Sequence, residues 1–87
     1  MTWRVFWSPH AEERLEKLLQ AAPDAALLIA AAKVIDRYLV TDPKSFGESR
    51  YDTVCVGFVL PLGNQYECQD VVHTVIVYDV WRIVRTS

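Results

Sequence analysis

Two helix-forming segments, parted by one proline-containing break and followed only by strand-like segments, constrain this fold most strongly. Ser8-Pro9 predicts a helix start, because serine caps the first turn and proline fits the first helical position. Good helix formers then fill residues 9–21 and, after Ala22-Pro23-Asp24, residues 25–40. Thr41-Asp42-Pro43 predicts the end of the second helix, since the residue before proline avoids helical geometry. So short a break predicts an antiparallel helical hairpin, with Asp24 capping its second helix.

Segments rich in β-branched and aromatic residues flank this hairpin and predict strands. The expected strands are residues 3–7, 53–60, 65–69 and 74–84. Residues 43–52 are expected to form a loop, and Pro61-Leu62-Gly63-Asn64 to form a hairpin turn.

Regular alternation in the first and last strands predicts apolar side chains on both faces. In the last strand it places Val75, Val77 and Trp81 on one face and Val80 on the other. In the first strand it places Phe6 on one face and Trp3, Val5 and Trp7 on the other. Such strands are expected to be covered on both sides, and the last strand to lie centrally.

The element order predicts an α+β domain over residues 1–87, with the helical hairpin packed on one face of a mainly antiparallel four-stranded sheet. The 87 residues suit a single domain, and a hydrophobic content of 52% can supply its core. The longest apolar run, residues 25–32, is too short to span a membrane, and no secretory signal is recognised. We expect a cytoplasmic protein in which Cys55 and Cys68 are reduced, although a disulfide across the hairpin remains an alternative.

The chain resembles the RelE/ParE superfamily of bacterial type II toxin–antitoxin systems, which includes plasmid stabilisation toxins. The resemblance spans nearly the whole chain in order. It is carried by the first strand with Ser8-Pro9, and then by Leu39-Val40-Thr41-Asp42-Pro43, Phe46-Gly47-Glu48-Ser49-Arg50, Pro61-Leu62-Gly63-Asn64-Gln65-Tyr66-Glu67 and Val75-Ile76-Val77-Tyr78-Asp79-Val80-Trp81-Arg82.

This resemblance implies a toxin that is neutralised by a cognate antitoxin. RelE-like members cut mRNA on the ribosome without a metal, as mRNA interferases, whereas ParE-like members inhibit DNA gyrase. The expected function is RelE-like cleavage. The alternatives are gyrase inhibition or a degenerate member that binds only a protein, whether an antitoxin, gyrase or a second copy of itself.

The resemblance places candidate catalytic residues at Arg82, where the last strand ends, and at Arg50. A guanidinium at Arg82 could clamp a phosphate, or it could pair with a carboxylate such as Asp79 or Glu67. Candidate RNA- or partner-binding residues are Lys44, Arg85 and Tyr66, and a core position is the alternative for the tyrosine.

Two features of the sequence disfavour the nuclease. The net charge is −2, whereas nucleic-acid binding usually needs a basic surplus. The resemblance implies several arginines and lysines around the cleft and often a tyrosine or histidine near the C-terminus, whereas the second half of this chain is poor in cations and we expect it to lack a catalytic tail. His10 and His73 are far apart in the sequence and have no metal-ligand spacing, so we expect neither a metal nor a cofactor.

Overall fold

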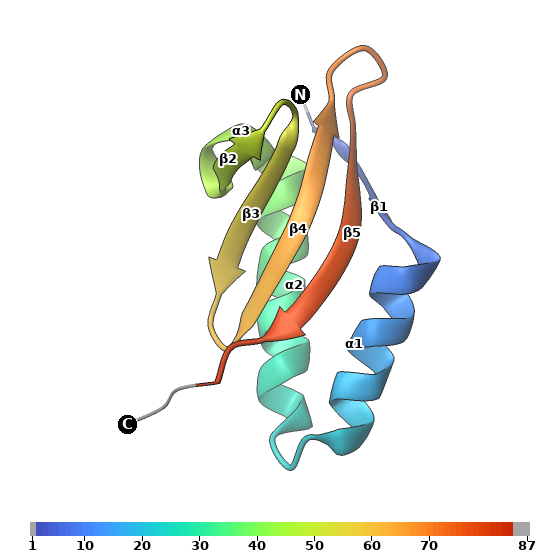
Figure 1. Ribbon diagram of the computed structural model, residues 1–87, viewed down its shortest axis with the longest axis vertical. Helices are drawn as coiled ribbons and strands as arrows, with labels where there is room; N and C mark the ends of the chain where they lie inside the picture. Colours follow the sequence, from blue (N-terminus) through green and yellow to red (C-terminus); the bar gives the residue numbers. More distant parts are fainter. Residues whose placement is uncertain (1, 85–87) are drawn as a thin grey trace.

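The computed structural model describes residues 2–84 and shows three helices on one side of a five-stranded mixed sheet (Figure 1). The elements are β1 (Arg4–Trp7), α1 (Pro9–Ala21), α2 (Ala25–Thr41), α3 (Pro43–Phe46), β2 (Glu48–Tyr51), β3 (Val54–Val59), β4 (Leu62–Gln69) and β5 (Thr74–Arg82). The α+β class and the placement of the helices are confirmed. The predicted count of four strands was wrong.

The strand order is β1-β5-β4-β3-β2, so the first and last strands of the chain are neighbours. β1 runs parallel to β5, with Val5 beside Val75, and every other pair is antiparallel. β5 is therefore an interior strand, as expected. A cis Leu60–Pro61 peptide lies in the short turn between β3 and β4.

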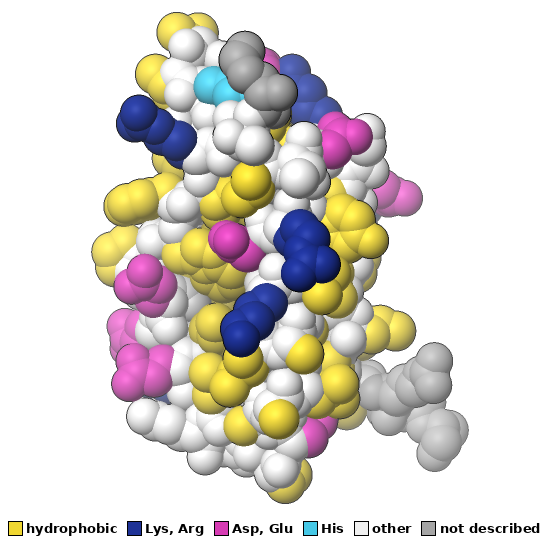
Figure 2. All heavy atoms as spheres, turned by 180° about the vertical axis from the view of Figure 1, so that it is seen from behind, with side chains coloured by type: hydrophobic (Ala, Val, Ile, Leu, Met, Phe, Trp, Pro, Cys, Tyr) yellow, Lys and Arg dark blue, Asp and Glu magenta, His cyan; other side chains and the backbone are white. Residues whose placement is uncertain are grey.

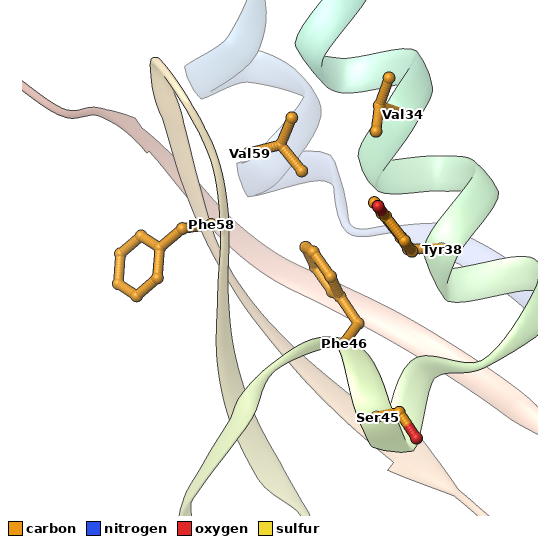
Figure 3. Close-up of a pocket in the computed structure, with 6 residues that line it drawn as sticks. All are labelled: Val34, Tyr38, Ser45, Phe46, Phe58 and Val59. Atoms are coloured by element: carbon orange, nitrogen blue, oxygen red, sulfur yellow. The ribbon is translucent and has the colours of Figure 1, made fainter.

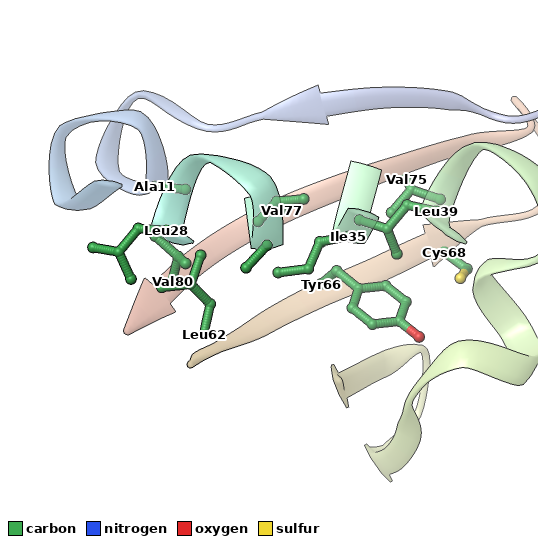
Figure 4. Close-up of a cluster of buried hydrophobic side chains, with 11 residues drawn as sticks. Ala11, Leu28, Ile35, Leu39, Leu62, Tyr66, Cys68, Val75, Val77 and Val80 are labelled. Atoms are coloured by element: carbon green, nitrogen blue, oxygen red, sulfur yellow. The ribbon is translucent and has the colours of Figure 1, made fainter. Parts of the chain in front are cut away.

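The helices α1 and α2 form where local signals predicted them. The Ser8 hydroxyl accepts a hydrogen bond from the Ala11 amide at 3.1 Å and caps α1. Asp24 occupies the cap position of α2, but its side chain makes no capping hydrogen bond, which corrects the expected cap. The buried side chains of α2 pack against the inner side of β4 and β5 and form one core with them (Figure 4). The largest side chains of this core are those of Leu28, Ile35, Leu39, Leu62, Tyr66, Val75, Val77 and Val80.

The segment predicted as a loop instead contains α3 and β2. β2 is a short edge strand whose side chains are all exposed, so it lacks the apolar pattern by which strands are recognised. The expected turn was also misplaced, because β4 already begins at Leu62 and runs for eight residues. Leu62 and Asn64 are buried on the core side rather than exposed in a turn.

A β-bulge at Tyr78 corrects the predicted faces of β5. Gln65 pairs with Asp79 and Tyr66 pairs with Val77, so Tyr78 is an extra residue in β5. The bulge shifts the alternation: Val80 is buried in the core, whereas Trp81 lies over Gly63, on the side of β4 opposite the buried Leu62.

The helices leave one face of the sheet uncovered over the described residues. In Figure 1, β3, β4 and β5 pass in front of α2 with no helix on the near side. Phe6 is exposed there, so the expectation that both faces are covered was wrong. Among the described residues, no helix is long and apolar enough to cross a membrane.

Candidate functional site

The uncovered side of the sheet, which we call the open face, is the candidate site. Register with the outward-facing residues of β4 places on it Arg4, Phe6, Glu48, Val54, Val56, Phe58, Gln65, Glu67, Gln69, Thr74, Ile76, Tyr78 and Trp81. Phe6, Ile76, Glu67 and Val54 form one row across four strands by register. The open face therefore presents aromatic and aliphatic side chains around Glu67, with Arg4 and Glu48 toward its two edges.

Glu67 is the centre of the polar contacts on this face. Its carboxylate accepts hydrogen bonds from the Thr53 hydroxyl at 2.7 Å, the Tyr78 hydroxyl at 2.7 Å and the Gln69 side-chain amide at 3.3 Å. These donors, the Thr53 and Tyr78 hydroxyls foremost, hold the pKa of Glu67 below its usual value. The same contact raises the pKa of Tyr78, which stays neutral and donates. A fixed negative charge therefore stands on the open face at neutral pH.

Arg82, the principal catalytic candidate, is held by a different carboxylate from those expected. Its guanidinium donates two hydrogen bonds of 2.8 Å to the two oxygens of Asp24, in the turn between α1 and α2. Hydrogen bonding in this pair lowers the pKa of Asp24 and raises that of Arg82. The pair connects the end of β5 to the tip of the helical hairpin.

The structure does not bring the other candidates to Arg82. Arg50 lies in β2 at the bulge beside Val54 and Cys55, whereas Arg82 lies beside Leu62 at the opposite end of β4. Lys44 in α3 makes a salt bridge of 2.5 Å with Asp70, which raises its pKa. Arg85 lies outside the described residues.

Tyr66 is a core residue and not a base-stacking platform. Its ring is fully buried, and its hydroxyl donates to the Pro43 carbonyl at 2.5 Å and accepts from the Gly47 amide at 2.9 Å. Burial raises the pKa of this hydroxyl far above its usual value. Tyr66 therefore fixes α3 against the sheet and is closed to a substrate.

A hollow between α2, α3 and β3 lies on the opposite side of β3 from the open face. It is lined by Val34, Tyr38, Ser45, Phe46, Phe58 and Val59. Figure 3 shows Tyr38 and Phe46 side by side, while Phe58 points away on the other side of β3. The rings of Tyr38 and Phe46 stack with their centroids 5.0 Å apart and cover this side of β3. Phe58 belongs to the open face.

Histidines, thiols and carboxylates do not gather into a metal site over the described residues. His10 contacts Asp79 at 3.4 Å, and Asp79 also contacts Arg14 at 3.6 Å. His73 stacks on Trp3 at the other end of β5. Cys55 and Cys68 are free thiols, and burial raises the pKa of Cys68 to about 11.

No family model matches the sequence, and no curated protein matches it either. The structure, however, is similar to solved chains of toxin–antitoxin systems. A chain of the RelBE2 toxin–antitoxin complex from Mycobacterium tuberculosis is 19% identical with a TM-score of 0.79, and the match covers 94% of this chain and 99% of that one. The chain has the RelE/ParE toxin fold.

Further solved structures share the RelE/ParE fold at lower identity. A chain of the chromosomal ParDE system from P. aeruginosa is 10% identical with a TM-score of 0.70, covering 94% of this chain and 97% of that one. The isolated E. coli RelE toxin is 10% identical with a TM-score of 0.58, covering 98% of this chain and 88% of its own. The resemblance recognised in the sequence is thus confirmed for the fold.

Sequence reasoning named Asp24 only as a helix cap and Glu67 only as a possible partner of Arg82, and it gave neither of them its observed contacts. Glu67 could have been placed opposite Tyr66 and Cys68 by alternation within the predicted strand 65–69, but the sequence does not show which face the helices leave open. Asp24 gives no such signal, because its partner is 58 positions away. Asp24 therefore pairs with Arg82, the principal catalytic candidate, within the folded chain.

Proposed function

We propose that this chain is the toxin of a toxin–antitoxin pair and that it acts by binding a protein target rather than by cutting RNA. The toxin role is supported by a fold shared with RelBE2, ParDE and RelE chains over nearly the full length. The mode of action is supported above all by one observation. Glu67, whose pKa is lowered, stands on the open face of the sheet.

A phosphodiester would meet an unfavourable electrostatic environment on the open face. The ionised Glu67 repels phosphate, and cleavage requires cations at the developing negative charge. Arg82 and Lys44, two of the expected cations, are already paired with Asp24 and Asp70. Ribosome-dependent mRNA cleavage is therefore the alternative that the first experiment must exclude.

A cognate antitoxin is the second expected partner, and the helix side of the molecule offers it an apolar groove. The groove lies between α1 and α2 and is lined by Trp7, Leu15, Leu19, Ile29, Ala32, Lys33 and Asp36. Figure 2 shows hydrophobic side chains reaching the surface among charged ones on this side. An amphipathic segment could cover such a groove.

Induced expression in a bacterial host tests the proposal directly, with growth, mRNA integrity and DNA replication followed together. We expect growth arrest with intact mRNA. Leu28→Asp is the control, because a charge in the core should abolish folding and with it the arrest. Ribosome-dependent mRNA cuts would contradict the protein-binding mode, and unimpaired growth would contradict the toxin role.

Asp24→Asn sharpens the same experiment. If the ion pair merely silences a nuclease, this variant frees the Arg82 guanidinium and mRNA cleavage should appear. We expect no cleavage from the variant, because Glu67 still stands on the open face. Arg82→Lys is the matched control, since lysine keeps the charge but loses the bidentate geometry.

A further inference from the structure

We infer that the protein target docks on the open face of the sheet and brings a lysine or arginine side chain to Glu67. The inference rests on the proposed protein-binding function and assigns it a surface and a partner chemistry. That chemistry is a basic side chain flanked by apolar ones. The groove between α1 and α2 stays available to a separate partner, because it lies on the other side of the sheet.

Large apolar side chains on several strands make the open face suitable for docking. Phe6 on β1 is 60% exposed, Phe58 on β3 is 50% exposed and Tyr78 on β5 is 38% exposed. Aromatic residues are enriched at the centres of protein interfaces, where they contribute large contact areas. A continuous face with exposed rings on β1, β3 and β5 is more than the scattered apolar exposure of an ordinary surface.

The carboxylate of Glu67 is prepared for a cation. A carboxylate offers about four acceptor positions, and the hydroxyls of Thr53 and Tyr78 and the amide of Gln69 occupy three of them. The remaining acceptor capacity is held in a fixed orientation, so that a charged donor binds with little loss of side-chain freedom. None of these intramolecular donors is a cation, so the charge of Glu67 is not neutralised by them.

The neighbours of Glu67 decide the nature of the partner. Ile76 on β5 and Val54 on β3 lie directly beside it, and docking on these apolar side chains would remove water from the carboxylate. An unpaired charge would then be unfavourable, so the partner must supply the opposite charge. Arg4 shares this face but aligns with Gln69 rather than with Glu67, and Arg50 lies in the edge strand β2; over the described residues neither forms an ion pair with Glu67.

Site-specific cross-linking in growing cells tests the inference. A photo-reactive phenylalanine analogue replaces Phe58, and a matched analogue replaces Gln20, which is exposed on α1. We expect cross-links only from position 58, to a peptide that contains a lysine or arginine flanked by apolar residues. Cross-links to nucleic acid, to a peptide without a basic residue, or none at all would overturn the inference.

Charge reversal then connects the cross-link to Glu67. We expect Glu67→Lys to reduce cross-linking at least tenfold, and a matching change of the partner's basic residue to glutamate to restore it. Unchanged cross-linking in Glu67→Lys, or no restoration, would overturn the inference. Phe58→Asp, at an exposed position that leaves the core intact, provides a second variant and should abolish growth arrest.

The two proposals fail in different ways. If the unaltered chain does not arrest growth, the toxin function fails, while cross-linking still tests the docking surface. If the unaltered chain arrests growth, and Glu67→Lys and Phe58→Asp arrest it equally well, the docking surface fails and the toxin function stands. Thermal melts of both variants verify that they are folded.

Discussion

The two faces of the sheet differ in the exposure of a tyrosine: Tyr66 on β4 is buried on the inner face, and Tyr78 on β5 is exposed on the open face. On the inner face the Tyr66 hydroxyl binds two backbone groups of the α3 segment, at Pro43 and Gly47. On the open face the Tyr78 hydroxyl binds the Glu67 carboxylate of β4. The same kind of hydrogen bond thus holds α3 against the sheet on one face and orients the Glu67 carboxylate on the other. The inner contact should matter for stability and the outer one for binding.

Removing the inner ring is expected to have the largest effect. Tyr66→Ala leaves a cavity in the core, and aromatic-to-alanine changes in cores cost about 3–5 kcal/mol in the free energy of unfolding. Tyr78→Ala is the matched change on the open face and should cost about 1 kcal/mol or less. Urea denaturation of both variants measures the difference. Equal losses would break the distinction between the two faces.

Removing only the inner hydroxyl is expected to have an intermediate effect. Tyr66→Phe keeps the ring but leaves the Pro43 carbonyl and the Gly47 amide without their partner. Unpaired buried polar groups cost about 1–3 kcal/mol. Chemical denaturation gives the loss, and amide hydrogen exchange at Gly47 should rise. An unaltered exchange rate at Gly47 would argue against this role.

A third change on the inner face should raise stability. Asn64 is fully buried, and both polar atoms of its side chain lack a partner among the described residues. Asn64→Val removes an unsatisfied amide and suits a strand, so we expect a gain of about 1–2 kcal/mol. Thermal and urea unfolding measure it. A loss of stability would show that the amide makes a contact of its own.

The smallest expected effect is on the open face and depends on pH. The pKa of Glu67 is lowered by folding, so its stabilising contribution is complete above its ordinary value of 4.5 and disappears as the pH falls through the lowered value. Glu67→Gln should therefore weaken the acid dependence of the urea midpoint. Asp24, whose pKa is lowered by Arg82, keeps part of that dependence in the variant. An identical pH profile would contradict the role of the carboxylate.

Local signals explain why most elements could be predicted from the sequence. α1 begins at Pro9 and ends at Ala21 as expected, because the cap at Ser8 and the break at Pro23 act within a few residues. β2 was missed because an exposed edge strand has no apolar periodicity. The bulge at Tyr78 could not be foreseen either, since it exists only in the pairing of β4 with β5.

The candidate site was less predictable than the fold because it depends on contacts distant in sequence. The sequence and the resemblance identified the cations but not their partners. The pairing of Arg82 with Asp24 requires the end of the sheet to meet the tip of the helical hairpin. Lys44 likewise meets Asp70 only after α3 packs beside the turn that leaves β4. These partners occupy two of the cations that were expected to bind phosphate, which supports the proposed protein-binding mode.

The parallel pairing of β1 with β5 has a consequence for the synthesis of the chain. β1 is translated before the other described strands, whereas its hydrogen-bonding partner, from Thr74 to Val77, lies in the last of them. Until β5 is synthesised the apolar side chains of β1 have no strand to pair with, and translation adds only about 5–20 residues per second. The open face cannot assemble on a nascent chain. Any activity that depends on the open face, including the binding proposed above, therefore requires β5 to have been synthesised and paired with β1.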